Sequence, residues 1–294
     1  MTPPAGLIDL SSRAKFRLTG PDSERYLNGQ VSNRVSLATA ELAIMACVCN
    51  VKGKLDAIVF ITRPADGEGF LIDAPGELRE SLQMRLDRYL IADDCELEDV
   101  TDEFAIIHTL DDGVHDSPLA AWKAAERFGA PGHDLWVTRD SFPSLVEAAG
   151  PLIDESAPEV EDFRIRRGIP RWGAELDPDT LPAEAGLDKT AIDFHKGCYL
   201  GQEVISRIQS VGKVTRSPVL MRIDDGDAAV GDPVFPAEAD DDTKPAGTIT
   251  SVTNDRKWAL GFVKRDWSGV ETKLVTRAAD GKVKVGNLEV RNFD

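Results

Sequence analysis

The pattern of the chain changes near Ser217, and this change constrains the fold more than any other feature. From there on, short β-like runs such as 219–223 and 258–263 alternate with Gly, Pro and Asp residues. Many short strands separated by turn residues are typical of a small barrel or sandwich. We therefore predict a first portion in residues 1–214, built as one body or two subdomains, and a C-terminal β-barrel in residues 215–294.

The first portion mixes strand and helix signals at irregular spacing. Residues 42–50 and 55–62 are apolar and β-rich and flank a Gly-containing turn, which predicts a hairpin. Leucines recur at steps of four in residues 78–90, as in a helix, and residues 119–128 are also predicted to be helical. This interleaving, with hairpins present, favours an α+β fold over a doubly wound parallel sheet.

The charge and the apolar runs exclude several classes of protein. The formal net charge is −17, which disfavours direct binding to nucleic acids or anionic membranes, because both need Lys/Arg patches. The N-terminal residues lack the basic and apolar stretches of a signal peptide, and no apolar run approaches the roughly 20 residues of a membrane helix. We expect a cytoplasmic protein with no nucleic-acid or membrane partner.

The four cysteines are Cys47, Cys49, Cys95 and Cys198. They form no C-x-x-C pair, so their spacing does not indicate a zinc site, and we predict no bound metal. Cys47 and Cys49 lie two residues apart in an apolar run and would share one face of a strand. We interpret them as small core residues rather than as metal ligands.

Cys198 differs from the other three cysteines in its surroundings. A helix is predicted to begin near residues 199–201, which places Cys198 at or just before its N-terminus. Free backbone N–H groups and the helix dipole favour a thiolate there, and His195 and Lys196 add basic character. From the residues alone, both a reactive or ligand thiol and a buried structural cysteine remain open.

The stretch Lys-Gly-Cys-Tyr-x-Gly-Gln-Glu, with an arginine four residues after the glutamate, resembles the signature of the YgfZ-type folate-binding proteins. These proteins are related to the glycine-cleavage T-protein, an aminomethyltransferase. The resemblance extends to blocks at residues 26–33, 49–54, 163–170 and 181–187. The matched signature positions are Lys196, Gly197, Cys198, Tyr199, Gly201, Gln202, Glu203 and Arg207.

This resemblance implies a T-protein-like fold in which the α+β portion and the barrel surround a central folate channel. It implies tetrahydrofolate, or a one-carbon derivative of it, as cofactor. The family supports assembly or repair of iron–sulfur clusters, including those of tRNA-modifying enzymes, so client or assembly proteins are the implied partners. Cys198 would be the functional thiol. The residues expected to contact folate are Asn33, Lys52, Arg164, Arg166 and Glu184.

Two other functions are compatible with the resemblance. One is a tetrahydrofolate-dependent aminomethyl or methyl transferase, which would be the activity if the protein is an enzyme. However, Arg34 and Arg166 lie at positions where the T-protein has acidic residues. The N–H donors along one edge of a pterin are best bound by a carboxylate acceptor, so these replacements argue against the transferase activity. We expect Arg164, Arg166 and Lys52 to bind the folate glutamate tail instead, unless the arginines only form a solvated helix face. The other function is a non-catalytic folate-binding scaffold.

A cluster held by this chain alone is disfavoured, since one suitably placed cysteine cannot supply the usual four thiolates. A cluster shared with a partner or a second copy remains open.

Overall fold

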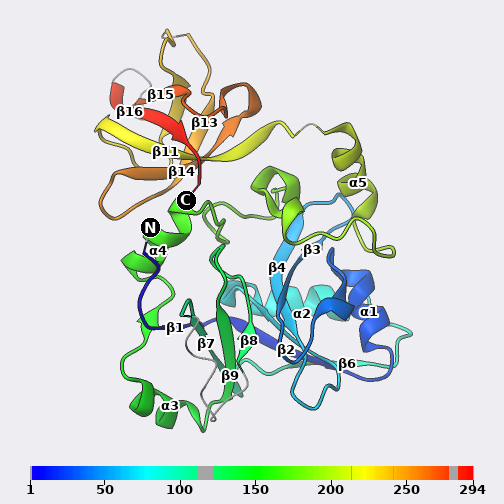
Figure 1. Cartoon of the computed structure of the whole chain (residues 1–294). Coiled ribbons are helices and arrows are strands. Elements are labelled where there is room, and N and C mark those ends of the chain that lie inside the picture. Colours follow the sequence, from blue (N-terminus) through cyan, green and yellow to red (C-terminus); the bar gives the residue numbers. More distant parts are fainter. Residues whose placement is uncertain (1, 112–121, 213, 241, 278–283, 294) are drawn as a thin grey trace. The chain divides into compact units, whose positions relative to one another are not determined.

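The computed structural model describes residues 2–111, 122–212, 214–240, 242–277 and 284–293 (Figure 1). The chain forms two compact units. The N-terminal unit consists of Pro4–Glu155 and Leu187–Arg207. The barrel unit consists of Met1–Pro3, Ser156–Gly186 and Ile208–Asp294. The segment Ser156–Gly186 therefore belongs with the barrel, although the sequence pattern had assigned it to the first portion.

The barrel unit contains a closed antiparallel barrel, which confirms the predicted C-terminal β-barrel (Figure 1). Its interior is filled by apolar side chains that include Val219, Met221, Ile249 and Leu288. In barrel order, the strands are β11 (Arg216–Gly226), β14 (Trp258–Lys264), β13 (Gly247–Val252), β12 (Pro233–Pro236), β15 (Lys273–Arg277) and β16 (Lys284–Arg291).

Helix α4 (Pro158–Arg166) packs on the barrel from outside. Its Ile165 forms a buried cluster with Leu220 and Leu260, which lie on β11 and β14. Alternation along β11 explains this arrangement, because Val219 and Met221 point into the barrel and Leu220 points out. The 3-10 helix η4 (Pro182–Ala185) also contacts β11.

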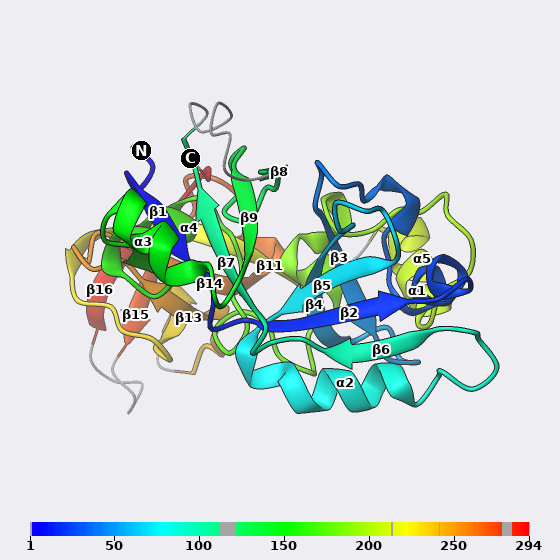
Figure 2. The same cartoon turned by 90° about the horizontal axis from the view of Figure 1, so that it is seen from below.

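The first sheet of the N-terminal unit is fully antiparallel and contains the predicted hairpin. Two helices, α1 (Ser23–Gln30) and α2 (Arg79–Asp87), contribute side chains to the apolar core on one of its faces. Figure 2 shows α2 running along this sheet. The strands, in sheet order, are β3 (Ile44–Cys49), β4 (Leu55–Thr62), β5 (Phe70–Ala74), β2 (Ala14–Thr19) and β6 (Glu96–Asp99).

The opposite face of this sheet carries Lys15, Cys47, Phe60 and Asp73. Strand pairing sets these four on one side, because Phe60 lies opposite Asp73, and Asp73 lies opposite Lys15. All four side chains are buried, so this face is covered as well.

The second sheet of the N-terminal unit follows the order β10-β1-β7-β9-β8. All its pairs are antiparallel except β1 with β10. These mainly antiparallel sheets and short helices confirm the α+β prediction. The bounds are β10 (Ile153–Asp154), β1 (Leu7–Asp9), β7 (Phe104–Thr109), β9 (His133–Thr138) and β8 (Lys123–Ala124), and helix α3 (Phe142–Ala149) lies between β9 and β10 in the chain.

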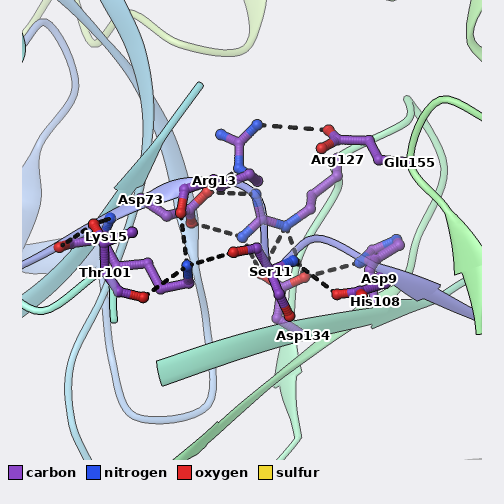
Figure 3. A network of polar contacts seen from close by, with 10 residues as sticks. All are labelled: Asp9, Ser11, Arg13, Lys15, Asp73, Thr101, His108, Arg127, Asp134 and Glu155. Atoms are coloured by element: carbon purple, nitrogen blue, oxygen red, sulfur yellow. Dashed lines mark hydrogen bonds and ion pairs between the residues drawn. The ribbon is translucent and has the colours of Figure 1, made fainter. Parts of the chain in front are cut away.

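A buried charge cluster joins the two sheets of the N-terminal unit (Figure 3). Arg127 donates to both carboxylate oxygens of Asp73, on β5, at 3.0 and 2.7 Å, and to both of Asp134, on β9, at 2.7–2.9 Å. His108, on β7, contacts Asp134 through Nδ1 at 2.8 Å, and Arg13 pairs with Asp73. One guanidinium thus bridges a carboxylate from each sheet.

The helix predicted for residues 119–128 is wrong where it can be assessed. Residues 119–121 lie outside the described residues, and the rest contains strand β8. Backbone pairing explains the difference, because Ala124 exchanges hydrogen bonds with Glu41 and Ala43. The buried Nζ of Lys123 donates to the carbonyls of Ala40 and Arg63. These tertiary contacts override local helix propensity.

Within the part of the chain that the structure describes, none of the helices has the length and apolar character needed to cross a membrane.

Candidate functional site

We call residues 193–201 the signature loop; it leads directly into helix α5 (Gln202–Val211). The loop lies against residues 29–33, which form the end of α1 and the segment after it. The backbone N–H of Asp193 donates to the carbonyl of Ser32 at 3.1 Å, and that of Leu200 donates to the carbonyl of Gly29 at 3.1 Å. Backbone contacts at both ends of the loop thus fix its position in the N-terminal unit.

Lys196 anchors the middle of the signature loop. Its side chain is buried, and Nζ donates to the carbonyls of Asn28, Val31 and Asn33 at 2.7, 2.7 and 2.8 Å. Asn28 lies in the last turn of α1, where carbonyls lack helical partners and the dipole attracts a cation. Burial lowers the pKa of Lys196 to about 8. Its charge is therefore directed at backbone oxygens.

Tyr199 and Gly201 pack the loop against the β3–β4 hairpin. The Tyr199 ring is buried, with Nζ of Lys196 5.1 Å from its centroid, and burial raises the pKa of its hydroxyl. Gly201 has φ of +86°, and a Cβ there would lie 2.6 Å from the carbonyl oxygen of Asn50 in the hairpin turn. Only glycine fits both the conformation and the space.

Cys198 is exposed, although Lys196 and Tyr199 on either side of it are buried. The predicted placement at a helix N-terminus is not confirmed, because α5 begins at Gln202, four residues later. The influence of a helix end falls off within its first turn. The two anchors instead hold Cys198 at the surface.

The other three cysteines are less accessible. Cys47 and Cys49 are fully buried in β3, where burial raises the pKa of Cys47 to about 12 and that of Cys49 well above its usual value. Cys95 is partly buried, and burial also raises its pKa. The interpretation of Cys47 and Cys49 as core residues agrees with this burial.

A pocket of about 680 Å³ lies beside the signature loop. Helix α1 contributes one wall, the loop contributes another, and the segment after α1 completes it. The residues that matter for its chemistry are Glu24, Arg25, Asn28, Arg34, His195 and Gly197.

Comparison with known proteins identifies relatives of this chain, although no family model matches it. An iron–sulfur cluster assembly factor IBA57 homologue of Pyricularia oryzae is 30% identical over 229 residues, covering 72% of this chain and 56% of that protein. The tRNA-modifying protein YgfZ of Escherichia fergusonii is 27% identical over 238 residues, covering 73% of this chain and 71% of that protein. The chain belongs to the YgfZ-type family.

The structural comparison agrees with this membership. The glycine cleavage system aminomethyltransferase T from Bartonella henselae superposes with a TM-score of 0.80 at 16% identity, covering 98% of this chain and 85% of that one. The fold is therefore T-protein-like. The chain spans little more than half the length of the IBA57 homologues that it matches first.

The YgfZ-type signature is divided between anchoring and accessible residues. Lys196, Tyr199 and Gly201 hold the loop in place. Glu203 and Arg207, on α5, are exposed, as are Gly197 and Cys198, and Gln202 is partly exposed as the first residue of α5. The loop thus brings four signature residues together at the surface or directly beneath it, in residues 196–199.

Two of the expected folate contacts lie in the N-terminal unit. Asn33 donates through Nδ2 to the carbonyl of Met45 at 2.8 Å and accepts the backbone N–H of Arg34 at 2.9 Å. Its amide therefore has a structural role next to the signature loop. Lys52 is exposed at the β3–β4 turn. The sequence had not indicated the pocket, because its walls come from segments far apart in the chain.

The expectation that Arg164 binds the folate tail is wrong. Arg164 is 3% exposed and donates to both oxygens of Glu161 at 2.9 and 2.8 Å and to Glu175 at 3.0 Å. Its remaining donors go to the carbonyl of Ile169 and to Ser251. All five N–H groups of the guanidinium are used, so none is left for a ligand carboxylate.

The remaining expected contacts, Arg166 and Glu184, lie in the barrel unit. The Arg166 guanidinium carbon is 4.6 Å from the centroid of the Trp258 ring, an arrangement typical of a cation–π contact. Glu184 is buried and accepts hydrogen bonds from Thr215 and Arg216, both at 3.1 Å. Glu184 thus ties η4 to the start of the barrel.

Proposed function

We propose that this protein supports the assembly or repair of iron–sulfur clusters, with a reduced folate as its ligand and Cys198 as its working thiol. The observation that carries the proposal is an exposed cysteine in a firmly anchored signature loop. The relatives add support, since the IBA57 homologues are named as iron–sulfur cluster assembly factors and YgfZ as a tRNA-modifying protein.

The chemistry of the site restricts how Cys198 could act. A single accessible thiolate can provide one ligand to a cluster, whereas clusters usually need four. The protein would therefore act on a cluster bound mainly by a client or assembly partner. Cys47 and Cys49 cannot complete the set, because both are buried in β3.

The folate part of the proposal depends on the T-protein-like fold and on the family. The exclusion of Arg164 leaves Lys52 and Arg166 as candidates for contacting the glutamate tail. The central channel and the cytoplasmic location remain predictions from the sequence.

Complementation of a strain that lacks its own YgfZ-type gene tests the role of Cys198. We expect Cys198→Ser to leave the activity of an iron–sulfur dehydratase at the level of the empty vector, because oxygen is a poor substitute for a thiolate ligand. Cys95→Ser, at a partly buried cysteine of the same unit, is the matched control and should restore activity fully. Full restoration by Cys198→Ser would show that the thiol is not required.

Calorimetric titration with tetrahydrofolate tests the ligand. We expect saturable binding with one site per chain, and unchanged affinity in the Cys198→Ser variant, because the thiol acts on the cluster and not on the folate. The absence of binding heat at high-micromolar tetrahydrofolate would remove folate from the proposal. The proposed role of Cys198 would not be affected.

A further inference from the structure

The pocket beside the signature loop is open to solvent and has room for a small molecule. Its volume of about 680 Å³ falls within the range of ligand pockets, roughly 300–1,000 Å³. Gly197 lines the pocket, and Cys198 is the next residue, with its Cα about 3.8 Å farther along the chain. A molecule bound there would lie against the backbone that leads into Cys198, whose own side chain is exposed and is not part of the lining.

The cationic groups of the pocket retain capacity to bind an anion. Among the described residues, Arg34 pairs with Asp193, whose carboxylate lies 2.8 Å from Nε, and the Arg34 side chain is 43% exposed. Its guanidinium offers planar donors, the geometry that binds carboxylates. Arg25 is 68% exposed, although Asp22 and Asp93 share its charge.

The other ionisable groups do not cancel this character. His195 is exposed at the rim, and Lys196 uses its Nζ on backbone carbonyls. Among the described residues that line the pocket, Glu24 is the single acidic one, and it pairs with Arg63 at 2.6 Å. The lining itself therefore carries more positive than negative groups, although Asp22, Asp93 and Asp193 just outside it pair with its two arginines.

Gly197 is not explained by the fold of the chain. Its φ lies outside the left-handed region, and a Cβ at this position would meet nothing within 4 Å. Neither conformation nor internal packing thus requires glycine. The absent side chain leaves open space in the pocket wall directly before Cys198, where another molecule can approach the backbone closely.

We infer that this pocket binds a small carboxylate-bearing thiol or disulfide, of the size and charge of glutathione, and presents its sulfur to Cys198. The inference shares with the proposed function the assignment of Cys198 as a working thiol, and it requires neither folate nor a cluster. The carboxylates pair with Arg34 and Arg25, and the peptide backbone passes over Gly197.

The reaction with the oxidised form is a thiol–disulfide exchange. Cys198 loses its proton, and its sulfur attacks one sulfur of oxidised glutathione. The S–S bond of glutathione breaks as a bond between Cys198 and one glutathione forms. The second glutathione leaves as a thiolate and takes up a proton, so one disulfide replaces another and no further oxidant is needed.

The test compares three disulfides on the full chain: oxidised glutathione, which is anionic, 2-hydroxyethyl disulfide, which is neutral, and cystamine, which is cationic. Mass spectrometry gives the rate of mixed-disulfide formation at Cys198 for each. We expect oxidised glutathione to react about tenfold faster than the neutral disulfide and cystamine to react most slowly, because the pocket concentrates anions. Added salt should reduce this preference.

Two variants test the assignment of the pocket. Arg34→Gln should lower the ratio of the glutathione rate to the neutral-disulfide rate by about five-fold, the loss of one partly exposed charge-assisted contact. Arg88→Gln removes an equal charge from an exposed position outside the pocket and should leave the ratio unchanged. Equal rates for the three disulfides, or equal effects of the two variants, would overturn the inference.

Labelling all four cysteines with a short pulse of iodoacetamide distinguishes failure of the pocket inference from failure of the proposed function. Iodoacetamide is small and neutral, so it reports accessibility and reactivity of the thiol without the pocket. Fast labelling of Cys198 with no preference among the disulfides rejects the pocket alone. Labelling of Cys198 no faster than that of the buried Cys47 and Cys49 rejects the working thiol on which both proposals depend.

Discussion

Replacing Arg127 with methionine is expected to lower the free energy of unfolding by about 3–5 kcal/mol, the cost of removing one partner from a buried ion pair. Arg127, Asp73 and Asp134 have side chains at most 4% exposed. Without the guanidinium, two buried carboxylates would lose their main counter-charge, and its five hydrogen bonds to Asp73 and Asp134 would disappear. Urea unfolding followed by circular dichroism measures the change.

Arg25→Met is the matched control for Arg127→Met. Arg25 also forms ion pairs with two aspartates of the N-terminal unit, but its side chain is 68% exposed. Exposed pairs contribute about 0–1 kcal/mol, so this variant should unfold almost as the wild type does. Similar losses in the two variants would show that burial does not set the energy of the Arg127 cluster.

The Arg127 cluster also predicts a pH dependence. Burial by itself would raise the pKa values of Asp73 and Asp134, but the charge of Arg127 outweighs it, and both pKa values lie below the usual range. A depressed folded-state pKa stabilises the fold above the unfolded value of about 4, and this contribution is lost as the pH falls. The difference between wild type and Arg127→Met should therefore be largest near neutrality and should shrink in acid.

A combined variant keeps this prediction testable if Arg127→Met fails to fold. The triple variant Arg127→Met, Asp73→Asn and Asp134→Asn removes the two buried carboxylate charges together with the guanidinium that neutralises them. Replacing a whole buried ion cluster by neutral groups is often far less costly than breaking it. We expect the combined variant to be more stable than Arg127→Met, and a further loss of stability would contradict the electrostatic explanation.

Replacing Gly201 with alanine is expected to destabilise the N-terminal unit by about 2–4 kcal/mol, from a strained left-handed backbone and an overlap with the hairpin. The residue has φ of +86°, and the added Cβ would lie 2.6 Å from the carbonyl oxygen of Asn50. Because that neighbour is backbone, it cannot rotate away. Urea unfolding again measures the loss, and hydrogen exchange should show faster opening in residues 193–205.

Gly197→Ala is the matched control, since Gly197 belongs to the same signature. Its conformation does not need glycine, and an added Cβ would meet open space, so stability should change by less than about 0.5 kcal/mol. The same variant should nevertheless slow the reaction of Cys198 with oxidised glutathione. Equal destabilisation by the two substitutions would contradict the division of the signature into structural and accessible glycines.

Local patterns in the sequence were sufficient for much of the fold. The β3–β4 hairpin, helix α2 and most of the barrel strands were predictable, although not β12, because apolar periodicity and turn residues act over a few neighbouring positions. The same reasoning failed at residues 122–128, where backbone pairing with Glu41 and Ala43 made a strand. A preference of a few tenths of a kcal/mol per residue could not compete with those bonds.

By itself, the sequence determined the α+β class, the C-terminal barrel and the YgfZ-type signature around Cys198. Only the tertiary structure decided what each signature residue does. The partners of Lys196 are carbonyls more than 160 positions earlier in the chain, and Arg164 is saturated partly by Ser251, 87 positions later. Burial and hydrogen bonding depend on which distant segments of the chain come into contact. A local sequence motif does not specify those contacts. For that physical reason the motif pointed to Cys198, whereas the fold showed that its thiol is exposed and that a cationic pocket lies beside it.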